Sequence, residues 1–231
     1  MKVDLLKYMA NRLQEECAKA GQPGPVITIS RLYGCPAKII AKKLTDALTE
    51  KMEVRGYKKI KWKMVTKEIM SESARELEVD PARIKYVFDY EQKGLIDDIL
   101  SSHLNKYYKS DRKIRNTVGK VIRNIACEGY AVIVGRGGVA ITRDIPRSLH
   151  INLEAPLEWR VIRISERNLL SLEDAEKYAH DIDRKRKQFR EYFEGKNTDY
   201  TKFDLTFNCM TLSIDEIVSI IIKAVEVRNF I

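Results

Sequence analysis

The residues best suited to chemistry in this 231-residue sequence lie in a short basic segment, R31-L-Y-G-C-P-A-K38. This segment follows the β-branched run V26-I-T-I29 and precedes apolar residues that recur at helical spacing. A strand that enters a helix through a tight turn directs backbone N–H groups and the helix N-terminus at a phosphate. The sequence therefore predicts a phosphate site in this loop. Its candidate residues are Arg31, Gly34, Cys35 and Lys38.

The same loop lacks several residues of a complete phosphate loop, G-x-x-x-x-G-K-[ST]. It holds a single glycine, Pro36 offers no N–H, and Ile39 stands where a hydroxyl that binds Mg²⁺ belongs. On the loop alone, a phosphate cradle and an ordinary strand-to-helix turn are both compatible with the sequence.

A second segment, V132-I-V-G-R-G-G138, joins a buried strand to a glycine-rich turn. Its glycines let the backbone approach a ligand closely or adopt positive φ. Arg136 carries a rigid fork of donors that suits a phosphate or a planar base edge. The alternative is a glycine-rich turn with a solvated arginine. Because ligands of parallel sheets bind beyond the carboxyl ends of the strands, we expect the first loop to lie beside Gly135 and Arg136.

Arginines and lysines are concentrated in residues 160–167 and 181–190, where the pattern is helical. Phosphoryl transfer needs positive charge around the migrating group, and arginines from a closing lid contribute about 10³-fold or more in rate. The alternative is a pair of solvated, charged helices with ion pairs one turn apart. The position of the cluster between two predicted strands favours an anion site.

Five predicted strands separated by helical segments indicate an α/β protein with a mainly parallel sheet covered on both faces. The strands are expected at residues 26–29, 60–65, 131–138, 148–153 and 203–208. Helices are expected at residues 1–19, 38–48, 80–90, 91–127 and 157–167, behind Thr66 or Ser71, and after Ser171 and Ser213. The apolar face of the helix at 38–48 is predicted to hold Ile39, Ile40, Leu44, Ala47 and Leu48.

The composition limits the classes of partner and compartment. A formal net charge of +9 suits nucleic acid, an anionic surface or a polyphosphate ligand. The four cysteines and three histidines are scattered without a C-x-x-C pair, so we expect neither a metal site nor a disulfide framework. No apolar run approaches the roughly 20 residues of a membrane helix, and the N-terminus lacks signal-peptide features. We therefore expect no membrane contact and a cytoplasmic location.

Taken together, these segments resemble the cytidylate kinase-like family of nucleoside monophosphate kinases. The resemblance rests on I27-T-I-S-R-L-Y-G34, V132-I-V-G-R-G-G138, A155-P-L-E-W-R-V-I-R-I-S-E-R167, D183-R-K-R186 and F203-D-L-T-F-N208. It covers about residues 25–225. It implies a P-loop NTPase fold of three α/β/α layers, with a five-stranded parallel sheet in the order 2-3-1-4-5 and a helical lid at about 160–200. The expected organisation is an N-terminal helical extension at 1–24 and the kinase-like domain at 25–231.

The resemblance also implies roles for individual residues. The acceptor nucleotide is expected at Gly135, Arg136, Asp183 and Arg186, and the ATP base and phosphates near Arg160 and Arg163. Ala37 occupies the place of the phosphate-loop lysine, so Lys38, one position later, is the candidate to reach a phosphate. Lys38 and Arg186 are the expected catalytic residues. Mg²⁺ is expected with ATP, and no metal site made by the protein alone.

The function that follows is transfer of the γ-phosphoryl group of ATP to a pyrimidine nucleoside monophosphate such as CMP, at a rate weakened by the altered loop. One alternative is an inactive nucleotide or phosphate sensor on the same fold. Another is a nucleic-acid-binding protein that uses Lys58, Lys59 and Lys61, although the sequence holds no recognisable binding module. The oligomeric state, including a homodimer, is left open.

Overall fold

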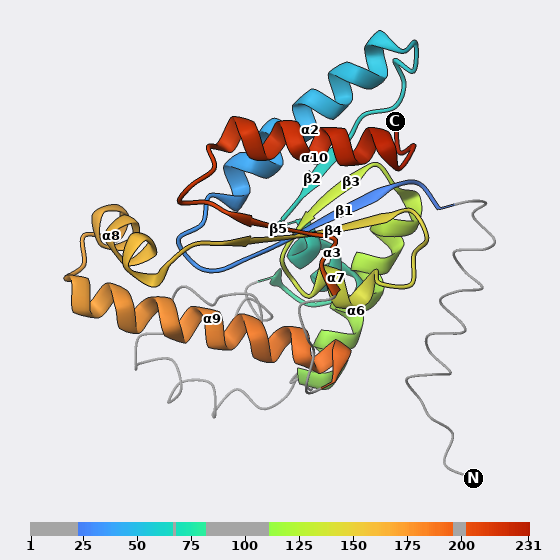
Figure 1. Cartoon of the computed structure of the whole chain (residues 1–231). Coiled ribbons are helices and arrows are strands. Elements are labelled where there is room, and N and C mark those ends of the chain that lie inside the picture. The colour runs from blue at the N-terminus through green and yellow to red at the C-terminus, as the bar shows by residue number, and fades with distance from the viewer. Residues whose placement is uncertain (1–22, 67, 82–110, 196–201) are drawn as a thin grey trace.

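The centre of the molecule is a five-stranded sheet whose strands all run parallel. Figure 1 shows the computed structural model, which describes residues 23–66, 68–81, 111–195 and 202–231. The strands are β1 (Val26–Arg31), β2 (Lys63–Val65), β3 (Ala131–Val134), β4 (Ser148–Glu154) and β5 (Leu205–Asn208). Their order, β2-β3-β1-β4-β5, confirms the predicted topology.

Helices cover both faces of this sheet (Figure 1). One face packs against α2 (Ala37–Val54) and α10 (Ile214–Val227) through a core that includes Ile27, Ile29 and Ile151. The other face packs against α3 (Glu68–Glu76), α6 (Asp111–Glu128) and α7 (Gly138–Ile141) through Val26 and Ile133. The three expected layers are therefore present.

Two helices between β4 and β5 form a helical hairpin near the carboxyl ends of the strands (Figure 1). They are α8 (Leu157–Asn168) and α9 (Leu172–Glu194). The predicted cap at Ser171 is confirmed, because its hydroxyl accepts a hydrogen bond from the Asp174 amide at 3.1 Å. A small third core around Ile164 and Ile182 joins the two helices.

The C-terminal half of α9 is packed by aromatic rings against the rest of the protein. A Cβ added at Gly119 of α6 would lie 2.9 Å from the Phe193 ring, and one added at Gly137 would lie 3.1 Å from it. Arg115 lies over the Phe189 ring, with 5.3 Å between its Cζ and the ring centroid. These contacts fix one end of α9 to α6 and to the turn that precedes α7.

Strand β4 is apolar on one face and polar on the other. Leu149, Ile151 and Leu153 enter the core beneath α2 and α10. On the opposite face His150 is buried, with Nδ1 2.8 Å from the Thr28 hydroxyl and Nε2 3.1 Å from the Ser148 hydroxyl. Burial lowers the pKa of His150 below its ordinary value, because the charged form loses its hydration.

Some predicted boundaries and contacts need correction. Strand β2 covers only Lys63–Val65 rather than 60–65, because the Ile60 amide closes a turn on Tyr57 and the Trp62 amide donates to the Thr49 hydroxyl. Ile39 is not part of the buried face of α2 but is 52% exposed. The helices expected at 1–19 and 80–90, and the start of the one at 91–127, lie outside the described residues.

Two further findings concern the cysteines and the helices of the described residues. Cys127 is disulfide-bonded, which the spacing of the cysteines did not predict. Within the described ranges, no helix has an apolar stretch long enough to cross a bilayer.

Candidate functional site

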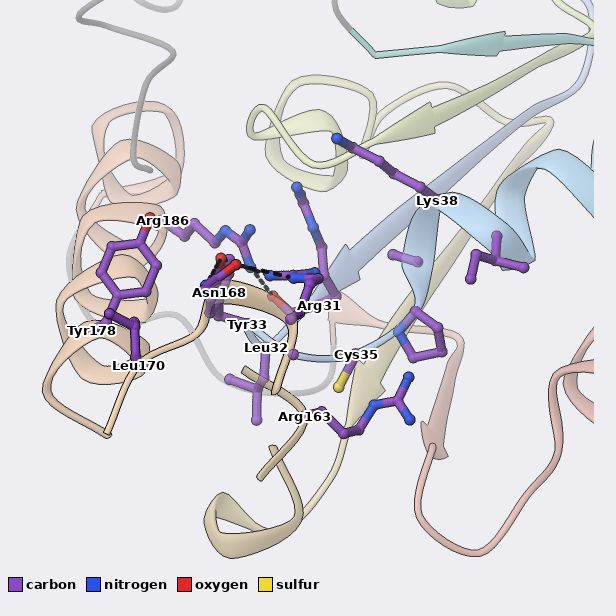
Figure 2. A pocket seen from close by; sticks show the side chains of 15 residues that line it. Arg31, Leu32, Tyr33, Cys35, Lys38, Arg163, Asn168, Leu170, Tyr178 and Arg186 are labelled. Carbon is purple, nitrogen blue, oxygen red and sulfur yellow. Dashed lines mark hydrogen bonds between the residues drawn. The ribbon is translucent and has the colours of Figure 1, made fainter. Parts of the chain in front are cut away.

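A cavity of about 730 Å³ opens between the loop after β1 and the α8–α9 hairpin, at the carboxyl ends of the strands where parallel sheets bind ligands. Figure 2 shows its lining, which combines residues 31–39 with side chains from α8, α9 and the corner between them. The lining side chains from the hairpin are Arg163, Arg167, Asn168, Leu170, Tyr178 and Arg186. The volume falls in the range of small-molecule sites.

Positive charge dominates this cavity, which is called the larger cavity below because a second cavity of about 450 Å³ lies next to it. Among the described residues that line the larger cavity are five cationic side chains and no carboxylate: Arg31, Lys38, Arg163, Arg167 and Arg186. Lys38 is exposed at the start of α2, and its side chain points away from Cys35 and Arg163 in Figure 2. Such a lining favours an anionic ligand with more than one charge.

Most backbone amides of the loop are already hydrogen-bonded. The Tyr33 amide donates to Asp183 Oδ1 at 2.7 Å, and the amides of Cys35 and Ala37 donate to loop carbonyls. Within the described part of the chain, the amides of Gly34 and Lys38 donate to no protein acceptor. The loop therefore keeps two N–H groups for a phosphate, beside the N-terminus of an 18-residue helix.

Gly34 is required by packing as well as by backbone conformation. Its φ is +98°, and an added Cβ would lie 2.9 Å from the Cβ of Arg160. The absence of a side chain thus lets α8 approach the loop, a contact that sequence reasoning did not foresee.

Tyr33 locks the loop to the helical hairpin. Its side chain is 4% exposed and packs edge-on against Tyr178. The Tyr33 hydroxyl lies 2.6 Å from Arg167 Nη2, which donates to it. The Arg186 guanidinium lies over the ring, with 5.2 Å between Cζ and the centroid. Two cations of the cavity are therefore held in place by one aromatic side chain.

Asp183 and Arg160 form a second link beneath Tyr33. Arg160 Nη1 donates to Asp183 Oδ2 at 2.8 Å and to the Tyr33 carbonyl at 3.0 Å, and its Nε donates to the Ala155 carbonyl at 3.1 Å. Arg160 is buried, and it is not among the described residues that line the larger cavity. The structure thus gives Arg160 a role in holding the loop, whereas Arg163, one turn later, does line the cavity.

A second cavity of about 450 Å³ lies between α9 and the polar face of β4. It shares Arg31, Leu32 and Arg186 with the larger cavity. Its remaining lining combines cations, two carboxylates, two other polar side chains and one aromatic ring: Arg184, Lys187, Arg190, Lys202, Glu154, Asp183, Asn152, His180 and Phe203. Asp183 and Arg186, which were predicted to bind an acceptor nucleotide, both lie here.

The loop after β1 and the turn after β3 were predicted to lie side by side, and one contact confirms this. A Cβ added at Gly135 would lie 1.8 Å from Arg31 Nη1, so the Arg31 guanidinium rests directly on this glycine. Arg136 has φ of 58°, a left-handed conformation that is uncommon for a residue with a side chain. Neither Gly135 nor Arg136 is among the described residues that line the two cavities, so their contact with an acceptor stays a prediction.

Several residues of the site were missed from the sequence. Tyr33 and Tyr178 line the larger cavity, and Asn152 and Glu154 line the smaller one. Arg167, which also lines the larger cavity, was predicted only as a member of the basic segment 160–167. The polar residues at every second position of β4 were the available signal for the smaller cavity, because they predict that one face of this strand meets a polar environment.

No metal-binding group of three is present among the described His, Cys, Asp and Glu side chains. The larger cavity offers no carboxylate among its described lining, and position 39 has no hydroxyl. The residues of the loop therefore do not fit a protein-held Mg²⁺, and an ion there would depend on ligands that a bound phosphate brings with it.

Comparisons with known proteins bear on the family and the fold. The sequence model of a family described as the cytidylate kinase-like family matches residues 26–211. A crystal structure of an uncharacterized protein from Eubacterium ventriosum ATCC 27560 has a similar fold, with a TM-score of 0.60 and 20% sequence identity. The match covers 87% of this chain and 98% of that one. No curated protein matches the sequence.

Proposed function

Because the chain belongs to the cytidylate kinase-like family, we propose that it transfers the γ-phosphoryl group of ATP to a pyrimidine nucleoside monophosphate such as CMP. Family membership indicates nucleotide binding and kinase-like chemistry in general. The choice of ATP as donor and of a pyrimidine as acceptor is the finer part of the proposal.

The observation that carries this proposal is the meeting of two cavities at two arginines. Arg31 and Arg186 belong to the lining of both the 730 Å³ and the 450 Å³ cavity. A donor phosphate in the larger cavity and an acceptor phosphate in the smaller one would therefore face each other across these side chains. Phosphoryl transfer needs this in-line approach with positive charge around the migrating group.

Different residues of the chain contact the donor phosphates, the acceptor and the transferring group. The amides of Gly34 and Lys38, together with the Lys38 ammonium, hold the donor phosphates. Asp183 and Arg186 lie on the acceptor side. Arg186 stabilises the charge of the transferring group, since it reaches both cavities. Mg²⁺ enters with ATP as part of the substrate and neutralises phosphate charge.

We expect slow turnover, because the loop offers a reduced set of donors. The Tyr33, Cys35 and Ala37 amides are occupied, and Pro36 has none. Loss of one preorganised contact to the transition state costs about 10²–10³ in rate. This reduced set equally favours the second candidate function, a nucleotide sensor that binds phosphate without transferring it.

A coupled assay with ATP, Mg²⁺ and each nucleoside monophosphate tests the proposal. Arg186→Met should lower kcat/KM by about 10²–10³, whereas Arg75→Met, an exposed arginine on α3, should leave it unchanged. Thermal stabilisation by ATP without turnover of any acceptor would support the sensor instead. Absence of both turnover and stabilisation would overturn both candidates.

A further inference from the structure

An exposed basic turn joins the end of α2 to β2. Residues 54–65 contain five cations and no acidic residue. All five cations are exposed, and none forms an ion pair within the described part of the chain: Arg55, Lys58, Lys59, Lys61 and Lys63. Tyr57, which lies among them, is 57% exposed. We propose that this basic turn (residues 55–63) binds single-stranded nucleic acid, with its cations at the phosphates and Tyr57 stacked on a base.

The backbone around Tyr57 is fixed although its side chain is exposed. The Tyr57 amide donates to the Met52 carbonyl at 2.9 Å, and the Gly56 amide donates to the Glu53 carbonyl at 3.0 Å. With Gly56 at φ of +92°, these two bonds form a Schellman motif at the end of α2. In that motif the residue after the glycine commonly packs its side chain on the helix, whereas the Tyr57 ring stays largely in solvent. A ring held on a fixed backbone loses little freedom when a base stacks on it.

The far end of the basic turn is anchored by Trp62. This side chain is 4% exposed and belongs to the core beneath α2, and its amide donates to the Thr49 hydroxyl at 3.0 Å. Lys61 and Lys63, on either side of it, are both exposed. This alternation is that of an extended chain, in which two residues span about 6.6 Å. The turn therefore presents successive cations along its length, which suits the successive phosphates of an extended strand.

Two general rules explain part of this charge without a ligand. Strand β2 is an edge of the described sheet, and lysines at a sheet edge hinder association between edges. Arg55 lies at the C-terminus of α2, where a cation offsets the helix dipole. Neither rule accounts for Lys58 and Lys59, nor for the exposed ring of Tyr57 beside them. Clustered cations together with an exposed aromatic ring are what sites for single-stranded nucleic acid share.

The composition of the basic turn favours a single strand over other polyanions. A segment that binds a membrane surface needs a broad apolar face, whereas the large exposed apolar side chains of residues 54–65 are Val54 and Tyr57. A duplex buries the faces of its bases in its own stack, so it offers no base to Tyr57. A single strand offers phosphates and free base faces together.

The basic turn is distant from the candidate active site. Helix α2 has 18 residues, so at about 1.5 Å per residue its C-terminus lies about 27 Å from the phosphate loop at its N-terminus. In Figure 1 the turn lies at the upper end of α2, away from α8 and α9. No residue of the turn is among the described lining of the two cavities. Nucleic-acid binding at this turn is thus a function separate from phosphoryl transfer and does not depend on it.

Fluorescence anisotropy of a labelled, unstructured oligonucleotide of about 12 nucleotides tests the proposal on the full chain. We expect a Kd of about 10⁻⁶–10⁻⁴ M at physiological salt. If each of the five cations displaces one counterion, the logarithm of the binding constant falls with the logarithm of salt concentration at a slope of about −3.5. The affinity should then fall by about 100-fold between about 50 and 200 mM salt. Absence of binding at about 50 mM salt would overturn the proposal.

Two variants of the basic turn separate its charge from its aromatic ring. Lys58→Gln/Lys59→Gln/Lys61→Gln should make the salt slope shallower by about 2. Tyr57→Ala should weaken binding by about 5- to 150-fold and leave the slope unchanged, whereas Tyr57→Phe should bind as the wild type does. Because all four side chains are exposed, the circular dichroism spectrum and Tm of these variants should match those of the wild type. Unchanged affinity in Tyr57→Ala would overturn the proposal.

The matched control removes the same charge elsewhere. Lys42→Gln/Lys177→Gln/Lys223→Gln neutralises exposed lysines on α2, α9 and α10 and should leave the affinity and the salt slope unchanged. An equal loss in both triple variants would overturn the proposal, because net charge alone would then explain the binding. Equal affinity for a duplex of the same length would also overturn it, as would binding to vesicles of anionic lipid at a salt concentration where the oligonucleotide does not bind.

Discussion

The contact between Asp183 and Arg160 allows a quantitative test of how the hairpin holds the loop. Asp183→Asn preserves volume but removes the negative charge from two hydrogen bonds, to Arg160 Nη1 at 2.8 Å and to the Tyr33 amide at 2.7 Å. The Arg160 side chain is 7% exposed, so its charge would remain buried without a counterion. Breaking a buried pair in this way costs about 3–5 kcal/mol.

We expect the lower end of this range, about 3 kcal/mol, because Arg160 keeps the carbonyls of Ala155 and Tyr33 as acceptors. For a protein of this size that loss corresponds to a fall in Tm of about 6–12 °C. Urea unfolding followed by circular dichroism measures the free energy directly, provided that the slope with denaturant is unchanged.

The matched control lies one half-turn earlier on the same helix. Asp181→Asn breaks a more exposed pair with Arg184, and such pairs contribute about 0–1 kcal/mol. The double variant Arg160→Met/Asp183→Asn should be less destabilised than the sum of the single variants, since it leaves no buried charge. A cost of Asp183→Asn equal to that of Asp181→Asn would refute the reasoning.

Three further predictions concern other parts of the fold. Gly135→Ala should cost about 1–2 kcal/mol for its positive φ and also lower kcat/KM by displacing Arg31. The control is Gly56→Ala, because Gly56 has φ of +92° and a Cβ added there would meet no heavy atom of another residue within 4 Å; it should cost the same stability without affecting activity. Equal activities of these two variants would contradict a role for Arg31. Because the pKa of His150 is lowered in the folded state, the unfolded chain binds the extra proton as pH falls below about 6.5, so stability should decrease from there down to the folded-state pKa; urea unfolding at pH 7 and 5 should show a smaller decrease in His150→Gln. Ser213→Ala removes the capping box of α10 and should cost about 1 kcal/mol by the same measurement, with an unchanged stability speaking against the cap.

The sequence predicted the strands well because their residues are apolar, β-branched and bounded by turns. The runs at Val26 and Ala131 are buried on both sides, as strands between two helical layers must be. The strand order came from the family resemblance, since the spacing of strands along a chain does not say which ones pair. Strand β2 was predicted too long because its start is decided by a distant hydroxyl on Thr49.

The site was predicted in outline but not in its internal contacts. Arg31, Lys38, Arg163 and Arg186 could be chosen because they are basic and follow strands or lie in the hairpin. The role of Arg160 as a buried support could not be predicted. Three arginines lie about one turn apart on α8, and the sequence does not show which of them is buried. The bond between the Tyr33 amide and Asp183 joins residues 150 positions apart, and no local pattern reports such a contact.

Because Phe193 packs against Gly119 and Gly137, a small tilt of α9 about Phe193 would move the far end of the helix most. Along a helix of 23 residues, the rise of about 1.5 Å per residue places Asp183 about 15 Å from this fulcrum and the corner with α8 about 33 Å from it. A tilt of about 5° around Phe193 would therefore move Asp183 by about 1 Å but the corner by about 3 Å. A tilt of this kind would thus move the lining of the larger cavity at Asn168 and Leu170 about twice as far as it moves Asp183.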